Sequence, residues 1–183
     1  MRGLGDPVAK SAAFWAVANY REAYGLFAAS GILFNHESPL RPARFVTQKV
    51  IRAAADIAMK RRTELLVLGN LDVWRDWGWA EEYVEATHLI LLHDTPQDFV
   101  VATGQSEPLK AFVAEAFAAF NLDWRAHVVS SGEFIRPLDI SVSAGCPDRA
   151  YRILGWKAQV RMPEVVRRLA SAAGAARCKE PRR

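Results

Sequence analysis

Cysteine and long apolar runs are scarce in this sequence, and each shortage excludes a class of protein. The 183 residues include two cysteines, Cys146 and Cys178. Their spacing fits neither a metal site nor a disulfide framework, so both thiols are expected to be free. Charged or polar residues interrupt every apolar stretch before it is long enough to span a bilayer. No membrane partner is expected.

Histidine is also sparse. The four histidines are scattered, and the pair nearest in sequence, His88 and His93, stands five residues apart on a predicted helix. Residues on one helix face are three or four apart, so this pair does not supply the two neighbouring ligands of a zinc site. No metal site is predicted.

The first ten residues lack two signals that would change the interpretation of the chain. They contain no apolar centre of a signal peptide, so a cytoplasmic protein is expected. Gly3 and Gly5 form the sole G-x-G motif, but Val8 stands where a dinucleotide fingerprint needs glycine and no strand precedes it. This motif therefore does not predict a phosphate-binding turn.

The positive charge of the chain is concentrated at its end. Four cations, Arg177, Lys179, Arg182 and Arg183, and one anion, Glu180, give residues 174–183 a charge of +3 out of a total of +4. Such a tail is usually disordered and solvated. Because no basic stripe with interleaved aromatics marks the rest of the chain, nucleic acid is not an expected partner. We expect one domain over residues 1–173 and a basic, disordered tail over 174–183.

The order of helix and strand patterns predicts an α/β protein. Helical patterns cover residues 7–24, 45–60, 80–93, 106–120, 147–154 and 162–173, and strand patterns cover 26–34, 65–68, 99–102 and 124–128. The helix from Ser106 has the clearest period, with Ser106 expected to cap it and Pro108 in its first turn. Its expected apolar face consists of Leu109, Phe112, Val113, Ala116, Phe117 and Phe120.

Residues 31–49, GILFNHESPLRPARFVTQK, hold the strongest signal for a binding site. An apolar strand pattern ends at Phe34 and is followed directly by Asn35, His36, Glu37 and Ser38. In open α/β sheets ligands bind at the carboxyl ends of parallel strands, so this segment predicts a ligand site. Arg41, Arg44 and Lys49 add nearby cations. A surface loop with solvated charges is the alternative interpretation.

Several segments together resemble one known family in their order and spacing. They are NYREAYG, GILFNHESPLR, FVTQK, WRDWG with EEYVEA, DFVVATG, IRP and ILGWK. They are similar to the carboxyl-terminal half of the GDP-mannose 4,6-dehydratase family, a group of extended short-chain dehydrogenases/reductases, over roughly residues 8–166. The resemblance implies a partial parallel Rossmann sheet with a small substrate-binding subdomain, and with the amino-terminal dinucleotide-binding half missing.

The resemblance also implies a reaction. Members of the family convert GDP-mannose to GDP-4-keto-6-deoxymannose with NADP as a recycled redox agent: hydride leaves C4, water is lost across C5 and C6, and hydride returns to C6. In their Tyr-x-x-x-Lys helical pair, the lysine cation favours the phenolate form of the tyrosine base. Lys10 matches that lysine, but Asp6 stands in place of the tyrosine. The family's threonine and glutamate belong to the half that is missing.

Matched residue by residue, the resemblance implies two groups of ligand contacts. Lys10, the one matched catalytic residue, would contact NADP together with His36 and Arg41. The GDP-sugar would be contacted by Asn35 at the sugar, Val46 and Lys49 at the guanine, Arg75 and Arg136 at the diphosphate and ribose, and Asp139 where the family usually has glutamate.

Each of these roles has a structural alternative. Arg75 could instead form a surface ion pair with Asp72 or Asp76. Arg136 could be an ordinary loop cation, and Lys10 an ordinary solvated helix lysine. Trp74, Trp77 and Trp79 are expected to serve packing and not ligand stacking.

Two functions of different classes remain open. The chain could belong to a working dehydratase, as part of a homo-oligomer or completed by a complementary amino-terminal half. Alternatively it could be a non-catalytic remnant that binds GDP-sugars weakly or associates with a full-length dehydratase. Missing sheet strands would leave apolar edges exposed, which favours association with a partner in either case.

Overall fold

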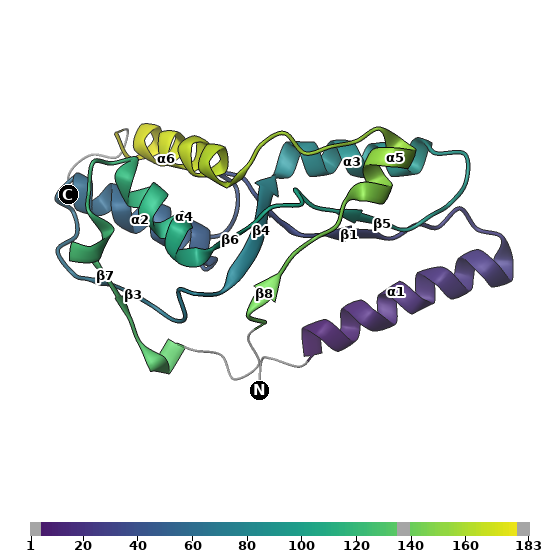
Figure 1. Cartoon of the computed structure of the whole chain (residues 1–183), viewed down its shortest axis with the longest axis horizontal. Coiled ribbons are helices and arrows are strands. Elements are labelled where there is room, and N and C mark those ends of the chain that lie inside the picture. The colour runs from purple at the N-terminus through teal and green to yellow at the C-terminus, as the bar shows by residue number, and fades with distance from the viewer. Residues whose placement is uncertain (1–4, 135–139, 179–183) are drawn as a thin grey trace.

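A computed structural model describes residues 5–134 and 140–178 of the chain. Helices and short strands alternate through these residues, which confirms the predicted α/β class (Figure 1). The helices are α1 (Gly5–Tyr24), α2 (Val46–Ala58), α3 (Ala80–Leu92), α4 (Leu109–Ala118), α5 (Asp148–Leu154) and α6 (Met162–Cys178), with 3-10 turns at Trp124–Ala126 and Gly132–Phe134. The strands are β1 (Gly31–Leu33), β2 (Asn35–Glu37), β3 (Leu66–Leu68), β4 (Trp74–Trp79), β5 (Phe99–Val101), β6 (Ser106–Pro108), β7 (Val128–Ser130) and β8 (Val142–Ser143).

The strands pair mainly in parallel, as the resemblance implied. β1 pairs with β5, β2 with β4 and β3 with β7, each in parallel. β8 is parallel to β4, and β6 is the one antiparallel partner among the described strands. β4 therefore pairs both with β2, the strand that follows β1, and with β6, the strand that follows β5. It lies between two groups of helices in Figure 1.

The core has two parts, one on each side of β4. The larger part packs α2, α4 and α6 against β3, β4 and β7, and the smaller one packs α3 and α5 against β5 (Figure 1). The predicted apolar face of α4 is confirmed: its members from Leu109 to Phe117 are buried, and Phe120 packs against the same cluster. Trp77 and Trp79 are also buried, as expected, whereas Trp74 is 41% exposed.

Three predicted elements differ from the structure. The strand expected over 26–34 begins only at Gly31, because Gly25 ends α1 in a left-handed conformation (φ 64°) and residues 26–30 form no ladder. Ser106 does not cap a helix, because residues 106–108 pair with β4 as β6 and the Ser106 hydroxyl donates to Ser143 O at 3.1 Å. The strand expected over 124–128 is a 3-10 turn followed by β7.

The last described helix extends into the segment 174–183. Residue 174, the expected start of a disordered tail, lies inside α6, which continues to Cys178. Residues 179–183 lie outside the described part of the chain. Cys146 is an exposed free thiol.

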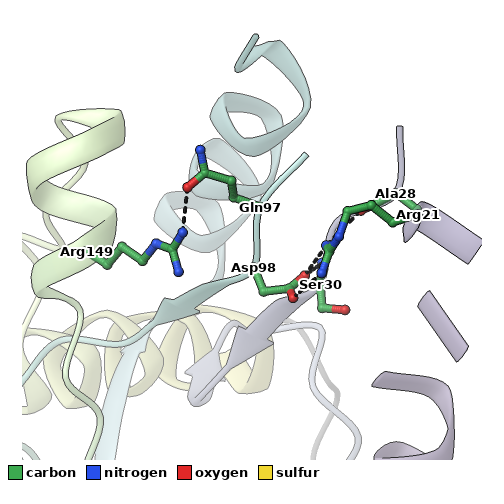
Figure 2. A network of polar contacts seen from close by, with 6 residues as sticks. All are labelled: Arg21, Ala28, Ser30, Gln97, Asp98 and Arg149. Carbon is green, nitrogen blue, oxygen red and sulfur yellow. Dashed lines mark hydrogen bonds and ion pairs between the residues drawn. The ribbon is translucent and has the colours of Figure 1, made fainter. Parts of the chain in front are cut away.

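α1 lies apart from both groups of core helices (Figure 1), and none of its residues from Val8 to Tyr24 is buried. Its carboxyl end is held by Arg21, whose guanidinium donates to both oxygens of Asp98 at 2.9 and 2.8 Å (Figure 2). Asp98 also accepts the Ser30 backbone N–H at 2.7 Å. The bidentate contact with Arg21 is the main cause that lowers the pKa of Asp98. This ion pair joins α1 to the start of β5, beside β1.

Among the described residues, no helix is both long and apolar enough to cross a membrane. The same residues contain no group of three or more His, Cys, Asp or Glu side chains placed to hold a metal ion.

Candidate functional site

The polar segment after Phe34 is a strand, not a surface loop. The Phe34 N–H donates to Val101 O at 2.9 Å, and the chain then leaves β5 and pairs with β4. In that register Asn35 lies opposite Trp77, His36 opposite Gly78 and Glu37 opposite Trp79. The carboxyl end of β1 thus delivers three polar side chains in fixed, partly buried positions.

The first of two pockets beside β2 has a volume of about 630 Å³. We call it the His36 pocket. Lys10 from α1, Asn35 and His36 from β2, and Arg41 from the following turn line it, together with Phe45. All three residues matched to the cofactor, Lys10, His36 and Arg41, therefore lie around one pocket.

The second pocket, of about 430 Å³, is called the Lys49 pocket. Asn35, Val46, Lys49 and Arg75, all matched to the GDP-sugar, line it. The other two matched residues, Arg136 and Asp139, lie outside the described residues. Asn35 and Phe45 line both pockets, so the two hollows are neighbours that share one wall.

Three cations line the Lys49 pocket, Arg44, Lys49 and Arg75, and backbone carbonyls hold the last two. Lys49 Nζ donates to Val67 O at 2.9 Å and lies 5.5 Å from the ring centre of Phe134. Arg75 Nη1 donates to Trp74 O at 2.8 Å and to Ile140 O at 2.7 Å. These contacts bring positive charge from α2 and from β4 to one hollow.

The two aspartates near Arg75 bind other groups. Asp72 forms an ion pair with Lys110 at 2.8 Å on the surface. Asp76 is fully buried and accepts the backbone N–H groups of Thr103 and Gly104 at 2.9 and 2.8 Å. Asp76 thus fixes the loop after β5 to β4.

The contacts of His36 determine its tautomer. Its Nδ1 lies 2.9 Å from Phe34 O, and a carbonyl oxygen can only accept, so Nδ1 carries the proton and Nε2 of the neutral ring is an acceptor. The imidazole also packs on the ring of Tyr83, with 5.2 Å between ring centres. A half-buried histidine with an oriented acceptor nitrogen suits a ligand hydroxyl or amide in the His36 pocket.

Gly78 makes room for the Tyr83 ring beneath His36. A Cβ at position 78 would lie 2.4 Å from Cε2 of Tyr83, which is closer than any van der Waals contact. Tyr83 is buried, and its hydroxyl has no hydrogen-bond partner in the described structure. Burial, followed by the charges of Asp76 and Glu82, raises the pKa of Tyr83 and keeps its hydroxyl neutral.

We expect Gly78→Ala to lower the free energy of unfolding by about 1–3 kcal/mol, because the new methyl group must displace the buried Tyr83 ring. Urea denaturation measures this change. Gly132→Ala is the matched control, since nothing lies within 4 Å of a Cβ at that position. Equal stability of the two variants would show that the Tyr83 ring can move without cost.

No individual role for Glu37, Thr47 or Tyr83 could be predicted from the sequence. Glu37 is 1% exposed; its Oε2 accepts the Thr47 hydroxyl at 2.8 Å and its Oε1 lies 3.2 Å from Arg41 Nη1. Burial raises the pKa of Glu37 to about 7, against the opposing effects of Arg41 and Thr47. Glu37 and Arg41 are four residues apart in the sequence, but this spacing indicates a buried ion pair only once Glu37 is known to be buried.

Comparison with known proteins identifies relatives of the chain. A family model described as GDP-mannose 4,6 dehydratase matches residues 7–169. The chain is 44% identical to GDP-mannose 4,6 dehydratase 1 of Arabidopsis thaliana over 158 residues, 86% of this chain and 44% of that protein. It is 41% identical to the GDP-mannose 4,6 dehydratase of Homo sapiens over 181 residues, 90% of this chain and 48% of that protein. The chain thus spans about half the length of these curated relatives.

Solved structures share the fold. RMD from Pseudomonas aeruginosa, complexed with NADPH, has a TM-score of 0.81 at 20% identity, and the match covers 92% of this chain and 55% of that one. The dTDP-glucose 4,6-dehydratase of Bacillus anthracis, in complex with NAD, has a TM-score of 0.82 at 11% identity, with coverages of 98% and 55%. At these identities the similarity shows the arrangement of helices and strands.

Proposed function

Because this chain belongs to the GDP-mannose 4,6-dehydratase family, we propose that it contributes the substrate-facing part of a site that converts GDP-mannose to GDP-4-keto-6-deoxymannose. One observation carries this proposal. The residues matched to the cofactor and the described residues matched to the GDP-sugar, taken from separate segments of the sequence, line two pockets that share Asn35 and Phe45. Neighbouring pockets are what hydride transfer between two ligands requires.

The His36 pocket has the donors and acceptors that a phosphate-bearing dinucleotide needs, so NADP is the proposed cofactor. Lys10 and Arg41 supply positive charge, and His36 Nε2 supplies an oriented acceptor. When bound there, NADP would supply the hydride chemistry at C4 and C6 of the mannose. Lys10 would hold the nicotinamide ribose, as in the matched family position.

In the Lys49 pocket, Val46 and Lys49 would hold the guanine and Arg75 the diphosphate. The planar guanidinium of Arg75 suits phosphate oxygens because it can donate two parallel hydrogen bonds. Asn35 would contact the mannose, since it lies at the wall shared by the two pockets. Arg136 and Asp139, matched to the diphosphate and ribose, complete the proposed set.

We further propose that the chain does not catalyse the reaction alone. Asp6 and Lys10 lie one turn apart in α1, where the family has its tyrosine and lysine. An ionised aspartate is a much weaker base than a phenolate, since the ordinary pKa is about 4 for aspartate and about 10 for tyrosine, and its negative charge would oppose a developing alkoxide. A non-catalytic GDP-sugar-binding protein is the alternative function, and the same replacement of tyrosine by Asp6 favours it.

Association with a second chain would supply the missing base. Apolar side chains that would suit such an interface are exposed along α1 and β1, including Trp15 at 67%, Tyr24 at 70% and Ile32 at 42%. Among the described strands β1 pairs with β5 alone, so its other edge is open to pairing. The proposed partner that supplies the base is a complementary amino-terminal half or a full-length dehydratase. A second copy of this chain could cover the exposed apolar side chains, but it also has Asp6 and would not supply the base.

Binding of the nucleotide sugar tests the proposed pocket directly. We expect Lys49→Met to weaken the binding of GDP-mannose, measured by calorimetry, about tenfold or more, because the variant loses one charge-assisted contact. Lys157→Met is the matched control, since Lys157 follows α5, is exposed and does not line this pocket. Equal loss in both variants, or no loss in either, would remove Lys49 from the proposed site.

A further inference from the structure

Glu37 is a buried carboxylate whose presence is not explained by stability. Its side chain is 1% exposed, and its two oxygens face one hydroxyl and one guanidinium. Taking a carboxylate out of water is costly, and a buried ion pair often stabilises a protein less than apolar side chains of the same shape. The position of Glu37 is therefore better explained by what it holds in place.

Glu37 holds the guanidinium of Arg41 together with two other groups. Arg41 Nη1 donates to His36 O at 2.5 Å and lies 3.2 Å from Glu37 Oε1, in an ion pair that lacks hydrogen-bond geometry. The guanidinium carbon lies 4.0 Å above the ring centre of Phe45. A carboxylate and a carbonyl thus contact Nη1, and an aromatic ring lies against the guanidinium.

Thr47 fixes the carboxylate in turn. Its hydroxyl donates to Glu37 Oε2 at 2.8 Å from the first turn of α2, and this leaves Oε1 directed to Arg41. Next to Thr47 in the sequence, Gln48 Nε2 donates to Ser38 O at 3.0 Å and so ties the turn after β2 to the same helix. The contacts form a chain from α2 through Glu37 to Arg41.

Arg41 has N–H donors that its contacts with Glu37 and His36 leave unused. It lines the His36 pocket, its contacts to Glu37 and His36 both use Nη1, and Nε is buried without a hydrogen-bond partner among the described residues. A guanidinium carries five N–H donors. A guanidinium held in this way loses little conformational freedom when an anion arrives.

We propose that Glu37 is a positioning residue: oriented by Thr47, it holds the Arg41 guanidinium for a phosphate group of the dinucleotide in the His36 pocket. The assignment of that ligand rests on the proposed function. Glu37 does not touch the ligand, so its effect on binding passes through Arg41.

The test is a double-mutant cycle on the full chain with NADP as the probe, using Glu37→Gln, Arg41→Gln and the double variant. We expect Glu37→Gln to weaken NADP binding about tenfold and Arg41→Gln to weaken it at least as much. The double variant should bind no more weakly than Arg41→Gln, because Glu37 has no effect once Arg41 is gone. Independent losses that multiply in the double variant, or wild-type affinity in Glu37→Gln, would overturn the proposal.

Two controls separate positioning from damage to the fold. Glu85→Gln changes an exposed glutamate of α3 and should leave NADP binding as it is. GDP, which would occupy the Lys49 pocket, should bind all variants equally. A parallel loss of GDP binding in Glu37→Gln would indicate a disturbed structure and overturn the positioning role.

A measurement without ligand separates this inference from the proposed cofactor. In carbon-detected NMR of the Glu37 carboxyl group, Arg41→Gln should move the titration midpoint upward, because the Arg41 charge lowers the pKa of Glu37. An unchanged midpoint would overturn the contact itself. A shifted midpoint in a chain that binds no NADP would support the Glu37–Arg41 contact and refute the proposed cofactor.

Discussion

Asp76→Asn is expected to lower the free energy of unfolding by about 3 kcal/mol. The carboxylate is fully buried and accepts the N–H groups of Thr103 and Gly104, so it fixes the turn that carries the chain from β5 to β6. Hydrogen bonds to a charged group contribute about 1.5–3 kcal/mol each. In asparagine one of the two acceptors becomes an amide group, which cannot accept and leaves one backbone N–H without a partner.

Asp72→Asn is the matched control for this change. Asp72 is four residues away in the sequence, is 73% exposed and makes an ion pair with Lys110. Exposed ion pairs contribute roughly 0–1 kcal/mol, so this variant should be nearly as stable as the parent. Urea denaturation measures the free energy of unfolding of both variants. Similar stabilities would show that Asp76 does not hold the turn.

Raising the pH from 5 to 8 is expected to lower the free energy of unfolding by roughly 2–3 kcal/mol through Glu37 alone. Burial raises its pKa in the folded protein from the ordinary 4.5 to about 7. Between these values the folded chain binds more protons than the unfolded chain, so stability is highest below the unfolded pKa and is lost as the pH rises through the folded pKa. Each pKa unit corresponds to about 1.4 kcal/mol.

Glu37→Gln isolates this contribution, because glutamine keeps the shape of the side chain and does not titrate. The stability of the variant should therefore decrease less than that of the parent between pH 5 and 8. Glu85→Gln should retain the parental pH dependence, since residue 85 is exposed on α3. A parent and a Glu37→Gln variant with the same pH dependence would contradict a raised pKa for Glu37.

The helices could be predicted largely from the sequence because their apolar period is local. α4 shows this most clearly: residues three and four apart, such as Leu109, Phe112 and Val113, are buried as its pattern required. The start of the helix could not be predicted in the same way. Ser106 has the properties of an N-cap, but residues 106–108 pair with β4, a contact with a segment about thirty residues earlier in the chain.

β4 was missed because its pattern is not that of an isolated strand. Residues 76–79 are all buried, so polar Asp76 and small Gly78 stand among tryptophans without the alternation of a half-exposed strand. Asp76 is satisfied by a loop distant in sequence, and Gly78 is required by the ring of Tyr83. Neither partner can be identified before the strands are paired.

The candidate site depended on the family resemblance more than on periodicity. The matched residues Lys10, His36 and Arg41 lie around one pocket, and Val46, Lys49 and Arg75 around the next, with Asn35 between them. Their contacts to ligands remain predictions. The burial of Glu37 could not be predicted, because a carboxylate among polar residues looks exposed in the sequence. It follows from pairing with β4 and from the contact with α2.

Turnover of GDP-mannose tests the central claim most directly. The purified chain would be incubated with GDP-mannose and NADP, and the 4-keto-6-deoxy product would be measured. A second incubation would add a full-length dehydratase that keeps its own tyrosine base but has a disabled substrate pocket. We predict no product from the chain alone and product when both chains are present, because this chain supplies the substrate-facing residues and lacks the tyrosine. Turnover by the chain alone would contradict this account. A mixture that forms no product, with a chain that does not bind GDP-mannose, would contradict it as well.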